Sequence, residues 1–279
     1  MKSVEERFAV HVDDYKNYDT EKLRKHFLIE QVFVDGDITF VYTHYDRLMV
    51  GGVKPLSQPI KLESYDQLKS EYFLDRRELG AINVGGKGKI TVDGTEYIID
   101  SKEALYIGRG NKDITFESID ASNPAKFYLN STPAHRVFPV KKLDKTVCNI
   151  LHMGSGETCN ERDIYQLMIN TSVESCQLQM GLTELKPGSN WNTMPCHTHS
   201  RRMEAYFYFN IPENQAVCHF MGPATETRHI WMGNEQAVVS PPWSMHTGVG
   251  TANYAFIWGM AGENLDYADM DHHKPSDLR

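Results

Sequence analysis

The sequence lacks a long hydrophobic run, a cluster of basic residues and an apolar N-terminal segment. No apolar stretch approaches the roughly 18 residues that cross a bilayer, and the start, MKSVEERFAVHVDDYK, has no signal-peptide core. Lysine and arginine number 29 against 37 acidic residues, which gives a net charge of -8. These features argue against a membrane protein and against nucleic acid or an anionic membrane as the main partner.

The cysteine content argues against a disulfide-stapled secreted protein. The chain has five cysteines, an odd number, and they are scattered at Cys148, Cys159, Cys176, Cys196 and Cys218. Free thiols in a reducing compartment fit this pattern better than a disulfide framework, so we expect a cytoplasmic protein. Apolar residues make up 41% of the chain and charged residues 24%, a balance that allows a buried core and argues against disorder.

Signals for helices are few, and most of the chain reads as short strands broken by Gly, Pro, Asn and Asp. Residues 19–28 predict one N-terminal helix with Asp19 or Thr20 as its cap, and residues 64–69 predict another turn or two. Strands are expected at 31–35 and 39–44. A hairpin is expected over 89–99, because Asp93-Gly94 suits the positive φ of a tight turn. The pattern is typical of an antiparallel sandwich or barrel.

A weak internal repeat indicates duplication. Residues 76–81 resemble residues 201–206, and residues 100–108 resemble residues 233–241. The second match is offset further than the first, as an insertion between the two matches in the later copy would produce. We therefore expect two diverged copies of one β unit, joined in the polar stretch 139–160.

The segment Pro195-Cys-His-Thr-His-Ser-Arg-Arg-Met-Glu204 carries the chemistry. Alternate side chains of a strand share a face, so His197 and His199 point together while Cys196 points away. Two imidazoles on one face form half of a metal site. Glu204 has the wrong parity for an unbroken strand and joins them only if the chain bends or bulges. His246, from a distant strand, is the best candidate for the fourth ligand.

This arrangement resembles the two sequence motifs of the cupin superfamily. His-x-His-x4-Glu is followed downstream by Pro241-x4-His246, and the Gly that commonly follows this Pro by two residues is Trp243 here. Cupins are β-barrels of six or more strands that hold a metal with three His and one Glu. The resemblance implies a site made of His197, His199, Glu204 and His246, with Glu204 also the catalytic carboxylate.

A longer resemblance covers nearly the whole chain. HFLIEQVFV, YFLDRRELG, WNTMPCHTH, RMEAYFYFN and the C-terminal DLR are similar to segments of the bacterial 5-keto-4-deoxyuronate isomerase family. This resemblance implies a zinc-dependent ketol isomerase of pectin and uronate breakdown, with one Zn2+ per chain. It would convert 5-dehydro-4-deoxy-D-glucuronate to 3-deoxy-D-glycero-2,5-hexodiulosonate. The resemblance also implies a homohexamer.

The expected fold is therefore an all-β, duplicated cupin of two jelly-roll β-barrels with a few short helices. Residues 1–140 would form a metal-free cupin-like domain and residues 141–279 a metal-binding cupin domain. Alignment of the copies places Tyr72, Leu74, Leu79 and Asp113 at the ligand positions of the first copy. Tyr and Leu side chains cannot hold a divalent ion there.

Arg201 and Arg202 lie between two predicted ligands and could bind the carboxylate of an acid sugar. The same pair stands in the metal-free copy at Arg76 and Arg77, however, which favours a structural role. We keep Arg201 and Arg202 as substrate-binding candidates with this alternative.

An aldose–ketose interconversion moves a proton between neighbouring carbons through an enediol, and a bound divalent ion stabilises the charge that develops on oxygen. The general base is not identified by the sequence; Glu184, Tyr206 and Tyr208 are possible. Two other functions stay open, an iron-dependent cupin dioxygenase and a sugar-binding cupin without turnover. No Gly-x-Gly-x-x-Gly or Walker loop is present, so neither NAD nor ATP is implied.

Overall fold

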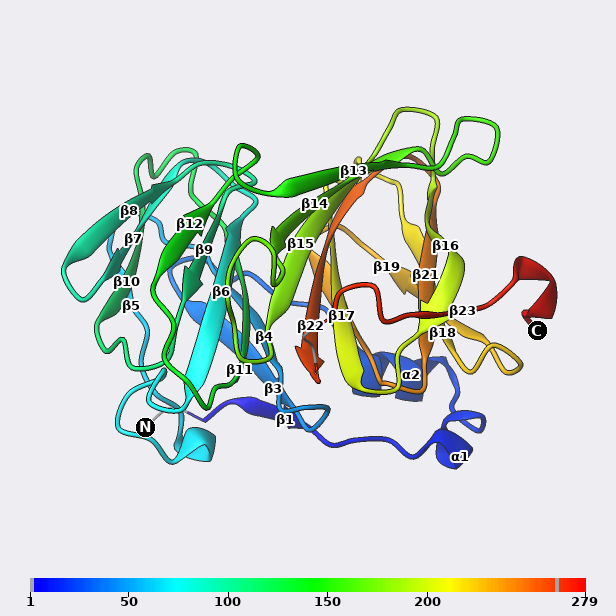
Figure 1. Cartoon of the computed structure of the whole chain (residues 1–279), viewed down its shortest axis with the longest axis horizontal. Helices are drawn as coiled ribbons and strands as arrows, with labels where there is room; N and C mark the ends of the chain where they lie inside the picture. The colour runs from blue at the N-terminus through cyan, green and yellow to red at the C-terminus, as the bar shows by residue number, and fades with distance from the viewer. Residues whose placement is uncertain (1–2, 264–265) are drawn as a thin grey trace.

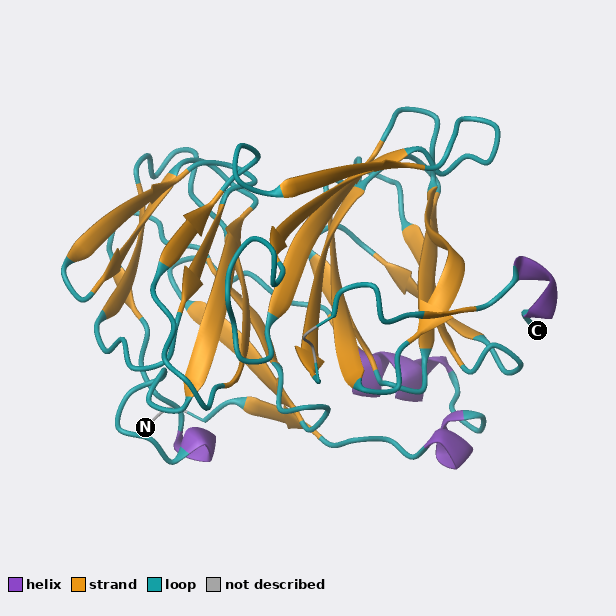
Figure 2. Cartoon of the chain, viewed as in Figure 1, coloured by secondary structure: helices purple, strands orange, loops and turns teal. Residues whose placement is uncertain are grey.

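The computed structural model describes residues 3–263 and 266–279 and consists mainly of strands. Strands hold 45% of the residues and helices 7%, which confirms the expected all-β class with few short helices. Figure 2 shows the helical turns at the edges of two sets of strands. Among the described residues, no helix is long and apolar enough to cross a membrane.

The first half of the chain contributes a large sheet and a small sheet, counted over the described residues. The large sheet has, in spatial order, β1 (Glu5–Arg7), β3 (Ile38–Thr43), β4 (Met49–Val53), β11 (Phe127–Pro133), β6 (Arg77–Asn83), β9 (Ala104–Ile107) and β12 (Lys141–Leu143). The small sheet has β5 (Ile60–Lys61), β10 (Ile114–Ser118), β7 (Gly88–Val92) and β8 (Thr95–Ile99).

The second half contributes a matching pair of sheets. The large sheet has β13 (Asn149–Met153), β14 (Arg162–Met168), β15 (Gln179–Leu185), β22 (Ala255–Gly262), β17 (Arg202–Phe209), β20 (Gln236–Ser240) and β2 (Leu28–Ile29). The small sheet has β19 (Arg228–Met232), β18 (Val217–Gly222), β21 (Met245–Gly250), β16 (Trp191–Thr198) and β23 (Asp271–His272). Figure 1 shows the two pairs of sheets side by side, the first at the left in blue to green and the second at the right.

The repeated sequence segments occupy the same places in the two large sheets. Their central strands run β4-β11-β6-β9 in the first half and β15-β22-β17-β20 in the second. The first sequence match falls on β6 and β17, and the second on β9 and β20. The extra residues of the later copy lie in longer connections on either side of β18. In the first half the equivalent connection between β7 and β8 is the predicted two-residue turn, in which Asp93 and Gly94 have φ of 46° and 84°.

The two halves exchange edge strands. The N-terminal β2 pairs with β20 in the second large sheet, whereas β12 from the start of the second half pairs with β9 in the first. The strand that we predicted over 31–35 is wrong: apart from an isolated bridge at Asp35, this segment has no strand partner. It leads from β2 in one sheet to β3 in the other, and on the way the Phe33 ring lies against Gly52 of β4.

The predicted N-terminal helix is α2 (Thr20–Phe27), preceded by the short α1 (Val12–Tyr15); the turns η1 (Asp66–Leu68) and η2 (Pro275–Asp277) are 3-10 helices. The side chain of Asp19 accepts a hydrogen bond from the Lys22 amide at 2.9 Å, as expected of a cap. Leu23 and Phe27 are buried, and α2 packs against β19 and β20. The helix therefore covers the second half of the molecule although it begins the chain.

The two large sheets pack against each other, and their close approach depends on two glycines. A Cβ at Gly80 of β6 would lie 2.4 Å from the Met180 sulfur, and one at Gly259 of β22 would lie 1.9 Å from Asn130 Oδ1. The rings of Tyr128 and Phe207 stack across this contact with centroids 4.6 Å apart. The central strands β6 and β17 are thus buried on both faces along their whole length.

A buried carboxylate ties the halves together. Glu78 of β6 is fully buried, and it accepts hydrogen bonds from the Tyr106 hydroxyl at 2.6 Å and from three backbone amides. These amides belong to Cys176, Gln177 and Leu178, at 2.8, 2.8 and 2.9 Å, in the segment that leads into β15. The Glu78 side chain therefore holds the start of a second-half strand on a first-half strand.

Replacing Glu78 by Ala should lower the free energy of unfolding by at least about 3 kcal/mol, because it leaves several buried donors unsatisfied. Urea unfolding followed by tryptophan fluorescence measures the change. The matched control is Glu96→Ala, which removes only an exposed partner of Lys89 and should leave stability nearly unchanged. Equal stability of the Glu78→Ala variant and the parent protein would contradict this role.

Candidate metal centre

Four side chains converge from three strands and one turn of the second half. His197 lies on β16, His199 just after it, Glu204 on β17 and His246 on β21. The chain turns between β16 and β17 and enters a different sheet, which is the bend that brings Glu204 beside the histidines. Cys196 is fully buried and does not belong to the cluster, as its strand parity predicts.

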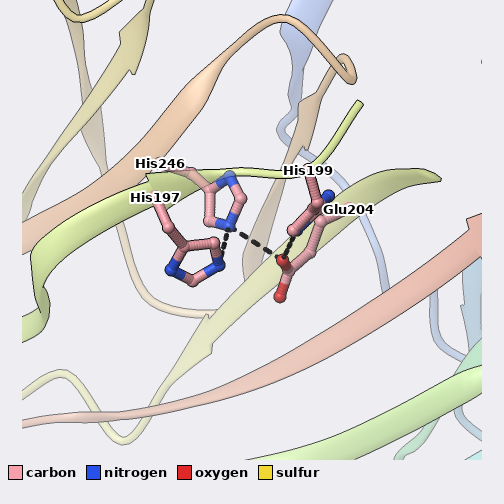
Figure 3. A group of neighbouring side chains, drawn as sticks. All are labelled: His197, His199, Glu204 and His246. Carbon is pink, nitrogen blue, oxygen red and sulfur yellow. Dashed lines mark hydrogen bonds and ion pairs between the residues drawn. The ribbon is translucent and has the colours of Figure 1, made fainter. Parts of the chain in front are cut away.

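The ligand atoms of these four side chains all lie within 4.8 Å of one another. His246 Nε2 is 3.1 Å from His197 Nε2 and 2.8 Å from Glu204 Oε2. His199 Nε2 is 2.9 Å from the same carboxylate oxygen. Figure 3 shows the three imidazoles and the carboxylate turned toward a common centre. All four side chains are buried, with exposed fractions between 0% and 6%.

In two of the three histidines, the remaining ring nitrogen holds the imidazole in the orientation that a metal needs. His199 Nδ1 donates to the Arg202 carbonyl at 3.0 Å, and His246 Nδ1 lies 3.3 Å from the Ser244 carbonyl. A neutral ring that donates through Nδ1 presents the lone pair of Nε2 to the centre. Lone pairs from imidazoles and a carboxylate oxygen then face each other, an arrangement that a cation between them stabilises.

Electrostatics favour the deprotonated state of His197 and of Glu204. Burial lowers the pKa of His197 well below its usual range, and the neighbouring His246 lowers it further. Burial opposes ionisation of Glu204, yet His246 and His199 beside it hold the pKa of that carboxyl well below its usual range. A neutral imidazole and an ionised carboxylate are the forms that bind metal. The donor set of three nitrogens and one oxygen therefore fits a divalent ion with ligand distances of about 2.0 to 2.2 Å.

The departure from the cupin motif at Trp243 does not disturb the turn that carries His246. The Ser244 amide donates to the Pro241 carbonyl at 2.9 Å and closes this turn. The indole of Trp243 packs on Tyr15 of α1 and Phe27 of α2, with ring centroids 5.0 and 6.4 Å away. The N-terminal segment thus accommodates a large side chain where a glycine is common.

A cavity of about 260 Å³ opens beside the cluster and exposes two of its ligands, His197 and Glu204. Much of its wall is apolar and comes from alternate residues of β22, namely Phe256, Trp258 and Met260. This is room for a small molecule beside a metal ion.

The three candidate bases lie in different surroundings. Glu184 forms ion pairs with Lys102 and Lys145 and does not line the cavity. Tyr208 also lies outside the lining, and its hydroxyl is 2.8 Å from His219 Nδ1. Tyr206 does line the cavity, where burial raises the pKa of its hydroxyl well above the usual range. Its hydroxyl is therefore a hydrogen-bond donor rather than a ready base.

Arg201 and Arg202 both bind the C-terminal segment. Arg201 is exposed and pairs with the Asp269 carboxylate, with Nε 2.8 Å from Oδ2. Arg202 is fully buried, and its guanidinium donates to the carbonyls of Asp266 and Tyr267 at 2.7 and 3.0 Å. These contacts fit the structural role expected as the alternative to substrate binding. Neither residue is part of the cavity lining. Substrate binding by Arg201 and Arg202 stays a prediction.

The four first-half residues that align with the predicted metal ligands do not come together in a polar cluster. Leu74 and Leu79 are buried in an apolar cluster between the two first-half sheets. Asp113 is 2.6 Å from Lys61 Nζ at the surface, and Tyr72 is half-buried.

Sequence reasoning missed several polar residues of the cavity lining, among them the three residues Arg162, Tyr267 and His272. His272 lies on β23 directly opposite His197, and the two rings are 5.6 Å apart. Burial raises the pKa of Tyr267 to about 12. None of the three belongs to a local motif, so a single sequence offers no signal for them.

Residues 27–275 match the KduI/IolB family. The 4-deoxy-L-threo-5-hexosulose-uronate ketol-isomerase of Formosa agariphila is 59% identical over 275 residues, 99% of this chain and 98% of that protein. The chain belongs to the KduI/IolB family. The enzyme of the same name from Bacteroides fragilis is 54% identical over 273 residues, which cover 98% of each chain.

Solved structures show the fold that the family members share with more distant proteins. An IolB-like protein of Salmonella typhimurium matches with a TM-score of 0.73 at 14% identity, over 88% of this chain and 96% of that one. Oxalate decarboxylase of Bacillus subtilis matches with a TM-score of 0.56 at 10% identity, over 80% of this chain and 71% of that one. The fold of this KduI/IolB family member is cupin-like, as the sequence motifs predict.

Replacing either His197 or His246 by Ala should remove the metal ion, because each change leaves three ligands around a buried centre. We expect one divalent ion per chain in the parent protein and almost none in either variant, as measured by elemental analysis after dialysis. His229→Ala, at an exposed histidine outside the cluster, should keep the full content. A His197→Ala protein with full metal content would exclude this site.

Proposed function

We propose that this protein is a metal-dependent ketol isomerase that converts 5-dehydro-4-deoxy-D-glucuronate to 3-deoxy-D-glycero-2,5-hexodiulosonate in pectin and uronate degradation. The observation that carries the proposal is the buried cluster of three histidines and Glu204, which opens into a cavity large enough for a six-carbon acid. Relatives with 54 to 59% identity along nearly the full chain bear a ketol-isomerase name, which supports the same reaction.

We propose that His197, His199, Glu204 and His246 hold one Zn2+. When bound, this ion supplies Lewis-acid stabilisation of the negative charge that develops on oxygen as the carbonyl moves. The same four ligands could also hold Mn, Fe or Ni. Glu204 has two roles in this proposal. It is a metal ligand, and it is also the catalytic carboxylate, because its side chain lines the cavity.

The protein's own contribution is to position the substrate and to exclude water from it. The side chains of Phe256, Trp258 and Met260 form an apolar wall that limits access of solvent to the reacting carbons. The Tyr206 hydroxyl is 2.8 Å from Thr193 Oγ1, and both residues line the cavity, so this pair can orient a substrate hydroxyl or carbonyl. The group that takes the proton is not assigned.

We propose further that residues 1–140 form a metal-free cupin-like domain and residues 141–279 the metal-binding domain, with the edge strands β2 and β12 exchanged between them. The central strands of the two large sheets follow the same order in the two halves, which supports this division. We also propose a cytoplasmic homohexamer. Light scattering of the purified protein should then give the mass of six chains of 31.9 kDa each.

The reaction itself is tested by running it in D2O under nitrogen. The enediol route exposes the migrating hydrogen to exchange, so the product should carry deuterium on the carbon that receives the proton. NMR of the product measures this incorporation, and elemental analysis of the same sample identifies the metal. Product without deuterium would point to a hydride shift or a shielded base. A requirement for oxygen would instead indicate a dioxygenase, and bound but unchanged keto-uronate a sugar-binding module.

A further inference from the structure

One cationic side chain lines the cavity beside the metal centre. Arg162, at the start of β14, is the only arginine or lysine among the described residues that form this lining. Ile164 lines the cavity from the same strand, whereas Asp163 between them pairs with Lys186 on the other face. Strand parity thus directs the Arg162 side chain into the space that His197 and Glu204 also face.

Among the described residues, few groups balance the positive charge of the Arg162 guanidinium or accept its hydrogen bonds. Its Nη1 donates to the Asn160 carbonyl at 2.8 Å, and no carboxylate of the described residues forms an ion pair with it. Burial lowers the pKa of Arg162, the sign of a cation held partly out of water. A desolvated guanidinium with unused donors is a site for an anion, and a planar carboxylate suits it best.

Arg162 and the metal ligands reach the cavity from separate strands. In the second large sheet, β15 and β22 lie between β14, which carries Arg162, and β17, which carries Glu204. The side chains of Phe256 and Trp258 on β22 line the cavity within this interval. The cavity therefore combines a metal site, an apolar wall and a single guanidinium.

The proposed substrate has the same distribution of groups. An aldehyde and its neighbouring hydroxyl, which react, stand at one end, and a carboxylate stands at the other. The deoxy carbon between them is a methylene, which offers no hydrogen bond and suits an apolar wall.

We propose that Arg162 binds the C6 carboxylate of the keto-uronate and so makes the site selective for acid sugars. This inference rests on the proposed function. Arg162 is a specificity residue here: it holds the unreactive end of the substrate while the reacting carbons face the metal ligands. The candidates Arg201 and Arg202 lie outside the lining, where their guanidinium groups bind the C-terminal segment.

The test compares the zinc-loaded parent protein with Arg162→Met and Arg162→Lys variants. The two substrates are the keto-uronate and its neutral analogue, in which the carboxylate is reduced to a hydroxymethyl group. Loss of a charge-assisted hydrogen bond should lower kcat/KM for the keto-uronate about 30- to 100-fold in Arg162→Met, mostly through KM. The neutral analogue should change less than about twofold. Arg162→Lys should give an intermediate KM, because it restores the charge without the planar fork.

Controls separate this role from a structural one. Metal content and the unfolding midpoint of each variant should match those of the parent protein. Arg136→Met removes an exposed guanidinium outside the cavity and should leave both substrates unaffected. An unchanged KM for the keto-uronate in Arg162→Met, or an equal loss for both substrates, would overturn the proposal. So would an Arg201→Met variant that loses keto-uronate selectivity while Arg162→Met keeps it.

Calorimetric binding of the keto-uronate distinguishes this proposal from the isomerase proposal. A parent protein that binds the keto-uronate without turnover, and loses that binding in Arg162→Met, would refute the isomerase function but retain the carboxylate site. Normal turnover with undiminished binding in Arg162→Met would refute only the carboxylate site.

Discussion

The packing of the two large sheets against each other determines which side chains of β17 and β22 face the candidate metal site. It buries one face of β17 and β22 against the first half, through contacts such as Phe207 on Tyr128 and the close approach at Gly259. The alternate residues of the same strands, including Glu204 and Trp258, therefore point into the cavity. Most residues of the cavity lining thus stand on strands that are packed from behind, and loops contribute fewer of them.

The turn between β16 and β17 also positions residues of the candidate metal centre. The Arg202 carbonyl accepts a hydrogen bond from His199 Nδ1, and the Arg202 side chain holds carbonyls of the C-terminal segment. This segment supplies Tyr267, Met270 and His272 to the cavity lining. Arg202 therefore connects the orientation of the His199 ring to the position of the C-terminal segment that lines the cavity. These contacts support the structural role expected for Arg202.

The duplicated halves have diverged in what fills them. In the first half, Leu74, Leu79 and neighbouring apolar side chains form a closed cluster, whereas the second half keeps a cavity beside the four-residue cluster, of which His197 and Glu204 form part of the wall. Glu78 and the exchanged strands β2 and β12 join the halves into one body. The first half thus supplies the surface on which β17 and β22 rest.

The sequence by itself determined the β class, the hairpin at Asp93-Gly94 and the four residues of the candidate metal centre. These depend on local rules, namely strand parity, turn chemistry and a motif of fixed spacing. The tertiary structure alone decided that Arg162 and His272 face the cavity and that residues 31–34 belong to no strand. Such placements depend on which strands lie side by side, and pairing joins segments as distant as β2 and β20. Local sequence cannot specify them, because the burial of a side chain is set by its neighbours in space.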